Sequence, residues 1–269
     1  MKFEIVDKKR CGEFINIFSN LKHFTDSINL IISKDKLYIQ GMDSSHVCVY
    51  ELFMDKSWFH LWEVSVDETY GIHLSMFNKI LHTCSDTQTI RIQGDQESDK
   101  LQLEFTSEVK GDFNKFFEIP LMDIECEMLH IPDCDYEVDI VMESKKFKSL
   151  IDELSHFNDT MTFKCDEGEF SVESNGESAT MKVVIDMNDI ESYGVIEDET
   201  VEASFGLKYL TQMCQFHKLA SNCTVHISRN MPIQIKFDIT DESRMRFYLA
   251  PKIDAVSYTH LTLPTNREV

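Results

Sequence analysis

Apolar residues recur along this chain at two spacings, one typical of helices and one typical of strands. The helical spacing i, i+3, i+4, i+7 puts four apolar side chains on one helical face, and it occurs twice. The first set is Phe14, Ile17, Phe18 and Leu21, and the second is Phe147, Leu150, Ile151 and Leu154. Residues 74–83 and 207–219 also carry apolar side chains at helical spacing. The pattern therefore predicts four amphipathic helices.

Most of the remaining chain alternates apolar and polar residues with a period of two, which is typical of half-buried strands. Clear examples are residues 89–93, 101–105, 224–228 and 233–239. Predicted strands outnumber predicted helices. Helices that cover antiparallel sheets give an α+β fold, which differs from a doubly wound nucleotide-binding fold.

The chain also contains an internal repeat at one long offset. The string Leu-Lys-His-Phe-Thr-Asp begins at Leu21 and the string Leu-Ser-His-Phe-Asn-Asp begins at Leu154, so the offset is 154 − 21 = 133 residues. Further pairs at this offset are Phe14 with Phe147, Leu30 with Phe163, and Leu74 with Leu207. One apolar register shared over so long a stretch indicates duplication of a domain.

Duplication predicts two domains, each with two helices packed on antiparallel sheets. We expect them at residues 1–121 and 138–254, with residues 122–137 as the connector. The connector is predicted to be extended, because Pro132 disfavours helix at the residue before it. Residues 255–269 look like the translation of a sequencing adapter, so this tail is expected to be non-native and to have no function.

The composition indicates a globular protein with an acidic surface. Of its 269 residues, 42% are hydrophobic, and 26 Lys and Arg stand against 47 Asp and Glu, so the formal net charge is −21. A negative total opposes binding to nucleic acid, because phosphate contacts depend on Lys and Arg. The objection fails if the basic residues gather on one inner surface, since the local field governs binding there. The distribution of charge therefore matters more than its sum.

Other classes of protein find little support in the sequence. No apolar run reaches the roughly 18 residues of a membrane span, and the start of the chain lacks the apolar core of a secretion signal, so we expect an intracellular protein without membrane contact. The eight cysteines are scattered and expected to be reduced, and Cys126 and Cys134 lack zinc-site spacing. No Ser or Cys in a recognisable nucleophile motif accompanies His46 as a catalytic base. An acidic hydrolase with paired carboxylates is the alternative among enzymes, but close carboxylates are unavoidable among 47. We expect no catalysis, metal or cofactor.

Two short segments far apart in the chain carry a family resemblance. They are residues 42–47, Met-Asp-Ser-Ser-His-Val, and residues 248–253, Tyr-Leu-Ala-Pro-Lys-Ile. Together they resemble the two lips of the partner-binding groove of the eukaryotic DNA sliding clamp, the proliferating cell nuclear antigen family. Further strings match this family in order, at residues 71–74, 79–81, 121–123, 129–132, 152–156 and 207–210. The resemblance covers about residues 1–254.

The resemblance implies a ring of three subunits joined head to tail, with helices lining the hole and sheets outside. It also implies a groove in which client proteins insert a short peptide with aromatic and aliphatic anchors. The positions that match this groove are Met42, His46, Val47, Leu129, Ile131, Pro132, Tyr136, Pro232, Tyr248, Ala250, Pro251, Lys252 and Ile253. Aliphatic and aromatic walls supply contact area for such a peptide, and backbone groups supply hydrogen bonds. The simpler interpretation, that some are ordinary core residues, weakens for Leu129, Ile131 and Tyr136, which lie in a linker without a core of its own.

The resemblance further implies that basic residues on the helices face DNA. The candidates are Lys9, Lys22, Lys79, His82, Lys145, Lys148, Lys208 and Lys218, although any one of them could simply belong to a solvated helix face. The chain departs from the family at Asn16, Ser149 and Asp152, which are neutral or acidic where basic residues are usual. The subunit contact is expected between residues 112–119 and 178–184, at Phe116, Phe117, Ala179, Met181 and Val183. Fewer positive charges imply a looser, salt-sensitive hold on phosphates without base recognition.

The resemblance therefore predicts a homotrimeric clamp around double-stranded DNA that gives a DNA polymerase its processivity and that other replication and repair proteins bind. A separate ATP-dependent loader is implied, because the chain has no Gly-x-x-x-x-Gly-Lys-Ser/Thr phosphate loop. A subunit of a heterotrimeric checkpoint ring, or an accessory factor that does not close a ring, is the alternative. The expected location is the nucleus or a viral replication compartment.

Overall fold

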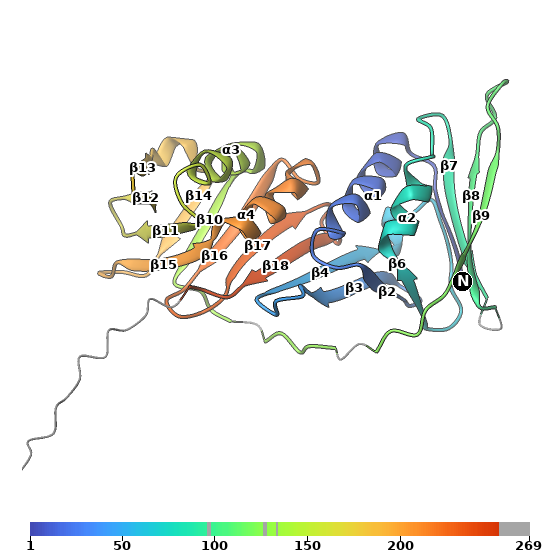
Figure 1. The fold of residues 1–269 in the computed structure, drawn as a ribbon, viewed down its shortest axis with the longest axis horizontal. Helices are drawn as coiled ribbons and strands as arrows, with labels where there is room; N and C mark the ends of the chain where they lie inside the picture. Colours follow the sequence, from blue (N-terminus) through green and yellow to red (C-terminus); the bar gives the residue numbers. More distant parts are fainter. Residues whose placement is uncertain (96–97, 126–127, 133, 253–269) are drawn as a thin grey trace, which may run out of the picture.

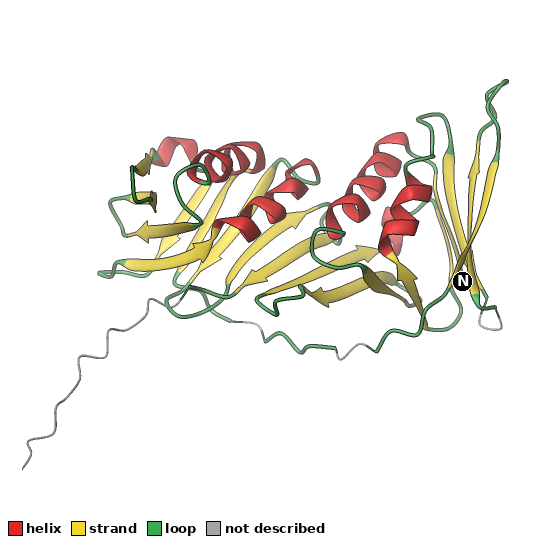
Figure 2. Cartoon of the chain, viewed as in Figure 1, coloured by secondary structure: helices red, strands yellow, loops and turns green. Residues whose placement is uncertain are grey.

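The four α-helices in the described part of the chain lie on one side of a long antiparallel sheet (Figures 1 and 2). The computed structural model describes residues 1–95, 98–125, 128–132 and 134–252. The helices are α1 (Lys8–Leu21), α2 (Leu74–Leu81), α3 (Ser144–Leu154) and α4 (Leu207–Cys214). Short 3₁₀ helices are η1 (Lys56–Trp58), η2 (Met187–Asp189) and η3 (Gln215–Lys218). The fourth predicted helix, residues 207–219, thus ends as α-helix at Cys214 and continues as η3.

The apolar faces predicted for the helices are the faces that pack. Phe14, Ile17, Phe18 and Leu21 of α1 are at most 1% exposed. On α3, Phe147, Ile151 and Leu154 are buried and Leu150 is half-buried. Asp7 caps the start of α1, where its carboxylate accepts a hydrogen bond of 2.9 Å from the backbone N–H of Arg10. This contact satisfies one of the free N–H groups at a helix start.

Among the residues described above, strands outnumber helices and form three sheets. The strands of the first half are β1 (Lys2–Ile5), β2 (Ser27–Ile32), β3 (Lys36–Met42), β4 (Cys48–Asp55), β5 (Leu61–Glu63), β6 (Glu68–His73), β7 (Thr89–Gly94), β8 (Lys100–Thr106) and β9 (Lys115–Pro120). Those of the second half are β10 (Val138–Glu143), β11 (Thr160–Cys165), β12 (Phe170–Asn175), β13 (Thr180–Ile185), β14 (Ser192–Val195), β15 (Val201–Gly206), β16 (Asn222–Ile227), β17 (Ile233–Asp238) and β18 (Arg244–Leu249). The predicted α+β fold with two duplicated domains is confirmed.

The central sheet is built from both domains. Its order is β14-β10-β16-β17-β18-β4-β3-β2-β6, so five strands of the second domain continue into four of the first. The outer sheets have the complementary orders β5-β1-β7-β8-β9 and β13-β12-β11-β15. Each domain therefore contributes one five-stranded and one four-stranded sheet, and the domains meet where β18 pairs with β4.

The offset of 133 residues holds for several elements but not for the first strand of each domain. It relates Leu74–Leu81 to Leu207–Cys214, because 74 + 133 = 207 and 81 + 133 = 214. Phe3 pairs with Ile92 while Ile140 pairs with the equivalent residue Val225, so the offset there is 140 − 3 = 137. A shorter helix, 11 residues in α3 against 14 in α1, accommodates part of this difference.

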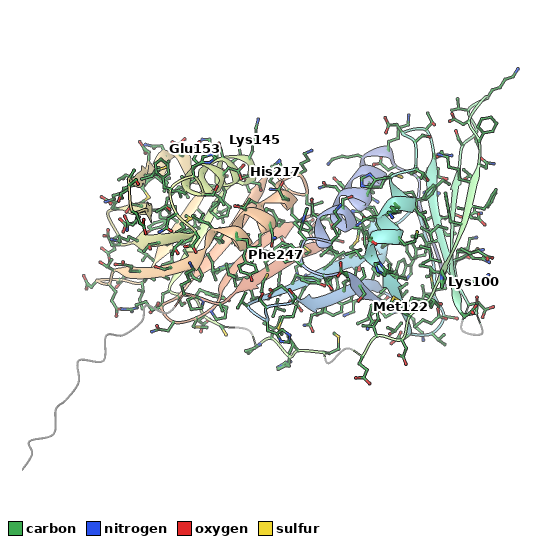
Figure 3. All side chains as sticks on the ribbon, viewed as in Figure 1. Lys100, Met122, Lys145, Glu153, His217 and Phe247 are labelled. Carbon is green, nitrogen blue, oxygen red and sulfur yellow. The ribbon has the colours of Figure 1, made fainter. Side chains whose placement is uncertain are left out.

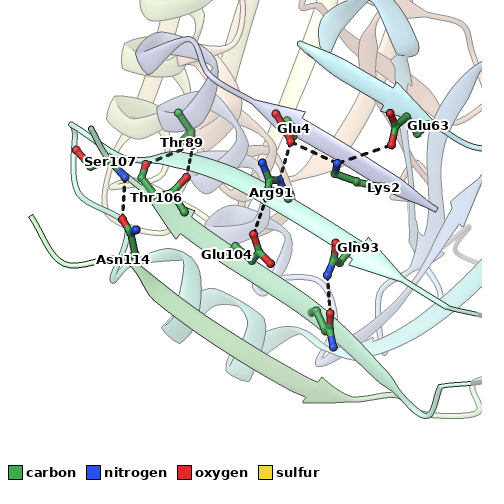
Figure 4. A network of polar contacts seen from close by, with 11 residues as sticks. Lys2, Glu4, Glu63, Thr89, Arg91, Gln93, Glu104, Thr106, Ser107 and Asn114 are labelled. Atoms are coloured by element: carbon green, nitrogen blue, oxygen red, sulfur yellow. Dashed lines mark hydrogen bonds and ion pairs between the residues drawn. The ribbon is translucent and has the colours of Figure 1, made fainter. Parts of the chain in front are cut away.

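Away from the helices, the outward face of the first domain's five-stranded sheet is polar. Figure 4 shows Arg91 between Glu4 and Glu104, with N···O distances of 2.6 and 2.9 Å. Gln93 donates a hydrogen bond of 2.6 Å to Gln102 across β7 and β8, the strands that also carry Arg91 and Glu104. Charged side chains thus cover the face opposite the core. No helix in the described part of the chain has the length and apolar character needed to cross a bilayer.

Candidate functional site

The connector crosses the central sheet on the side opposite the helices, where Figure 1 shows it as a long extended segment. Over its first part, among the described residues from Met122 to Leu129, three contacts hold it there. The N–H of Met122, labelled in Figure 3, donates to the Gly71 carbonyl at 2.9 Å, and the Asn29 amide donates to the Ile124 carbonyl at 3.0 Å. The Gln40 side chain both donates to the Leu129 carbonyl at 2.9 Å and accepts from its N–H at 2.8 Å. The connector is therefore fastened to β6, β2 and β3.

Glu51 is the centre of a polar cluster on β4 beside the connector. Its carboxylate accepts hydrogen bonds from the Tyr38 hydroxyl at 2.5 Å, the Gln40 amide at 3.4 Å and the Tyr248 hydroxyl at 3.3 Å. Burial, together with Glu51, raises the pKa of Tyr38 and of Tyr248 above the ordinary tyrosine value. Both phenols therefore stay protonated and remain donors to the carboxylate.

The first lip, residues 42–47, is organised by Asp43. Its carboxylate accepts from the backbone N–H groups of Ser45, Val47 and Cys48 at 2.8, 2.9 and 2.7 Å, and from the Tyr209 hydroxyl at 3.2 Å. Burial alone would raise the pKa of Asp43, but these four donors together hold it below the ordinary value. His46 has φ of 58°, in the left-handed region, and its side chain is exposed. The lip is thus a turn whose shape depends on one carboxylate.

The second lip joins the first directly. The N–H of Ala250 donates to the Val47 carbonyl at 3.0 Å, and the N–H of Lys252 donates to the Ser204 carbonyl at 2.8 Å. The Lys252 ammonium also pairs with Asp159 at 2.9 Å. Pro251 is half-buried between these contacts. Ile253 and the tail, residues 255–269, lie outside the described residues.

The predicted groove residues fall around two hollows rather than one. Pro132, Tyr136 and Tyr248 line a hollow of about 300 Å³ between the connector and β18, together with His226 and Arg246. The other hollow, of about 460 Å³, lies between the first lip and residues 22–27. Met42 and His46 line it. Leu129 is 37% exposed and Ile131 is half-buried in the connector, while Pro232 is exposed before β17.

On the helix side, most of the predicted basic residues are exposed. These are Lys9, Lys22, Lys79, His82, Lys145, Lys208 and Lys218. Lys148 differs, because it is half-buried and pairs with Asp152 one turn later on α3. Its charge is therefore partly neutralised by a residue at which the chain departs from the family pattern. Lys9 pairs with Glu13 at 3.3 Å but remains 86% exposed at its side chain.

The two predicted contact strands are both edge strands, β9 in one outer sheet and β13 in the other. Phe116 points outward and is 67% exposed, whereas Phe117 packs on Phe105 with ring centroids 5.4 Å apart. Met181 and Val183 are half-buried against the core, and exposed Ala179 precedes β13. The prediction omitted Val184, which is 57% exposed on β13.

Two family models together cover nearly the whole described chain. The N-terminal domain of proliferating cell nuclear antigen matches residues 9–130, and its C-terminal domain matches residues 130–252. The chain belongs to the proliferating cell nuclear antigen family. This membership agrees with the resemblance carried by the two lips and by the internal repeat.

Relatives in this family span almost the whole chain. A protein of Thermococcus fumicolans named DNA polymerase sliding clamp is 28% identical over 254 residues, which are 94% of this chain and all of that protein. A protein of the same name from Pyrococcus horikoshii is 26% identical over the same share of both chains. A chain of the PCNA2–PCNA3 complex of Sulfolobus tokodaii has the same fold, with a TM-score of 0.83 at 20% identity. The match covers 94% of this chain and 99% of that one.

The sequence patterns did not single out Asp43, Gln40 or Glu51, although these side chains hold the first lip, the connector and Tyr248 through hydrogen bonds. A local signal existed for Asp43, because an Asp in a turn commonly accepts from the backbone N–H two residues later. Gln40 and Glu51 carry no such signal, since their partners lie in the connector and on β18.

Proposed function

We propose that this chain forms a homotrimeric ring around double-stranded DNA and tethers a DNA polymerase and other clients through the groove. The observation that carries the proposal is a correspondence between strand edges. Within the chain, β18 of the second domain pairs with β4 of the first. Their counterparts in the repeat are β9 and β13, and each of these is an edge strand. The edges of two copies can then join as β18 and β4 join within one copy.

The register of this contact follows from the repeat. Ile92 and Val225 are equivalent and pair with Leu103 and Ile235, which in turn pair with Phe117 and Phe247. Phe117 therefore corresponds to Phe247. By the same reasoning through β3 and β12, Met181 corresponds to Tyr50. Because Phe247 lies opposite Tyr50, Phe117 of one copy should lie opposite Met181 of the next.

The remaining pairs in this register are chemically compatible. Phe116 of one copy would lie opposite Lys182 on β13 of the next copy. Ile119 would lie opposite Ala179. Arg244 over Phe53 at 4.7 Å is a cation–π contact in the internal junction, and Lys182 can make a similar one with Phe116. Such a head-to-tail contact gives a closed ring only when the rotation per copy closes, and three copies are the number the family resemblance implies.

The helix side supports a DNA-binding hole. Lys22, Lys79, Lys145, Lys208 and Lys218 are exposed there, and within the described residues none of them is in an ion pair. Contacts from Lys to phosphate carry no sequence information and weaken with salt. The net charge of −21 does not oppose this hole, because carboxylates such as Glu4 and Glu104 lie on a face turned away from the helices. A separate ATP-dependent loader would open the ring.

A ring of different subunits is the second candidate, because a solved structure with this fold is named as a complex of PCNA2 with PCNA3. Light scattering on the purified chain separates the two. A homotrimer has a mass near 3 × 31.3 = 94 kDa, whereas a chain that needs other subunits stays near 31.3 kDa or forms an incomplete assembly.

Primer extension on a long template, with loader and cognate polymerase, tests the function. We expect the wild-type chain to lengthen the products, and Leu129→Asp to return them to the length made without clamp, because a carboxylate enters an apolar wall. Met128→Asp is the matched control, since Met128 is adjacent and 47% exposed but is not a predicted groove residue. Products of equal length with and without the wild-type chain would refute the processivity claim.

A further inference from the structure

The hollow of about 300 Å³ between the connector and β18 extends over the second domain's half of the central sheet. We call it the Arg246 hollow. Side chains in register across four neighbouring strands line it, and these are Asp139 on β10, His226 on β16, Gln234 on β17 and Tyr248 on β18. Arg246 lies two residues before Tyr248 on β18, so it faces the same side of the sheet. Tyr136 at the end of the connector forms one wall.

Arg246 is the residue that points to a ligand. Its Nε is buried and has no hydrogen-bond acceptor among the described residues. The strand register places Arg246 opposite Glu51, but no ion pair joins them within the described part of the chain. Two tyrosine hydroxyls and one amide engage the Glu51 carboxylate instead. A half-buried guanidinium without a counter-charge gains free energy when it binds an anion.

The other arginines in the described part of the chain have stronger partners. They contact carboxylates, a backbone carbonyl or an aromatic ring, and they are Arg91, Arg229, Arg10 and Arg244. The acceptor beside Arg246 is the Tyr248 hydroxyl, which carries no counter-charge. The charge of Arg246 is therefore available to a molecule that enters the hollow.

The remaining polar groups of the hollow are compatible with an anion. The Gln234 side chain has no hydrogen bond to another described residue, and its amide can supply two N–H donors. His226 Nδ1 is hydrogen-bonded to Asp139, so the nearest carboxylate on the sheet is already engaged. Asp135 also lines the hollow but is exposed on the connector, where water screens its charge.

The equivalent face of the first domain satisfies its own polar groups. The strand register makes Gln93, Gln102 and Glu118 the counterparts of His226, Gln234 and Tyr248. Gln93 donates to Gln102 at 2.6 Å, as Figure 4 shows, and Glu118 pairs with Lys100 at 2.7 Å. Phe116 occupies the position of Arg246. The unpaired cation thus belongs to the second domain, beside the connector.

We propose that the Arg246 hollow binds an anionic side chain of a client peptide, either a carboxylate or a phosphorylated hydroxyl. The guanidinium fork contacts two oxygens of the anion, and the Gln234 amide donates to the same group. Tyr136 and Tyr248 are predicted groove residues that also line the hollow. A peptide whose aromatic anchor contacts Tyr248 therefore reaches Arg246 about two residues further on, because alternate residues of a strand are about 7 Å apart. The inference rests on the proposed function and adds a charge preference to a groove predicted from apolar anchors.

A peptide scan tests this preference on the wild-type protein alone. The probe is a fluorescent peptide with the aliphatic and aromatic anchors and with alanine at the flanking positions. Glu, phosphoserine, Gln or Lys replaces each flanking alanine in turn, and anisotropy gives the Kd. We expect one position at which Glu or phosphoserine lowers the Kd by about tenfold, Gln has little effect and Lys raises the Kd. The larger of the two gains identifies the anion. Equal Kd values for Glu, phosphoserine, Gln and Lys at every position would overturn the proposal.

Two matched variants then locate the preference. Arg246→Met keeps an apolar stem but removes the charge, so the gain from the anionic residue should fall below about twofold. Lys236→Met is the control, because Lys236 lies opposite Arg246 but pairs with Asp238 at 2.9 Å and does not line the hollow. The gain should persist in this control, and the all-alanine peptide should bind both variants as it binds wild type. A gain that persists in Arg246→Met would assign the preference to another residue and overturn the proposal.

The Arg246 hollow and the proposed function fail in different ways. If only the hollow is wrong, the wild-type chain still forms a 94 kDa ring and still binds the all-alanine peptide, while charge at the flanking positions has no effect. If the groove itself is wrong, the all-alanine peptide does not bind the wild-type chain, and the anion subsite falls with the groove.

Discussion

The junction between β18 and β4 and the free edges β9 and β13 occupy equivalent positions in the repeat. In the internal junction, Phe247, Tyr50 and Leu52 are at most 1% exposed. At the free edges the equivalent Phe117, Met181 and Val183 are only half-buried, and Phe116 and Val184 are more than half exposed. An uncovered strand edge with apolar side chains is a template for pairing with another chain. The internal junction is therefore closely packed, whereas the equivalent edges leave apolar side chains free for the contact proposed between copies.

The proposed groove lies beside the internal junction, and the equivalent edges lack its parts. The turn before β4 spans residues 43–47, and Asp43 organises it. In the second domain the equivalent of Asp43 is Gly176, and a tight turn closed by Gly176 and Ala179 at 3.0 Å precedes β13. The connector passes along the first domain's half of the central sheet and reaches the second domain at Tyr136, whose ring lies 5.2 Å from that of His226. A ring of three copies would therefore contain six strand junctions but only three client grooves.

The largest expected effect is loss of assembly on Phe117→Glu. The substitution places a carboxylate opposite Met181, and burial of an unpaired charge costs several kcal/mol. Light scattering should then fall from 94 kDa to 31.3 kDa. Val66→Glu is the matched control, because Val66 is 45% exposed and lies on neither edge. A 94 kDa mass for Phe117→Glu would mean that β9 is not the contact strand.

Substituting alanine for Phe247 and for the equivalent Phe117 compares the packing of the internal junction with that of the free edge. Phe247→Ala removes a ring that packs on Phe24 and Phe216 at centroid distances of 5.4 and 5.0 Å, so it should lower the free energy of unfolding by about 3–5 kcal/mol. Phe117→Ala should cost less than half of that in the monomer, because its ring is already partly exposed.

Urea denaturation followed by circular dichroism measures both changes. Both variants should be compared in a Val183→Glu background. This substitution disrupts the β13 edge, so that assembly does not add to the measured stability. Equal losses at the two positions would show that the free edge is as well packed as the internal junction, and the proposed contact would lose its basis.

Sequence patterns captured what depends on local spacing. Apolar periodicity placed α2 and α4 at their observed starts, Leu74 and Leu207, and the repeat related their ends. The same patterns could not reveal that Gln40 holds the connector at Leu129, 89 residues away, because that contact depends on how the sheet brings the two together. They also could not show that Lys148 pairs with Asp152, since a lysine on a helix has several partners within reach. Faces and repeats were predictable, whereas polar contacts between distant segments were not.

The smallest expected effect concerns the lip that only the internal junction possesses. Asp43→Asn removes the charge that three backbone N–H groups and Tyr209 contact, which should cost about 1–3 kcal/mol of unfolding free energy near neutral pH. The pKa of Asp43 is lowered in the folded chain, so its contribution is present above the ordinary value of 3.8 and is lost as pH falls through the lower folded value. The stability difference between wild type and Asp43→Asn should therefore shrink below pH 3.8. Glu51 and the other carboxylates are common to both proteins and cancel in this difference, so a gap that stays constant from pH 7 to the acid range would contradict the role of the Asp43 charge.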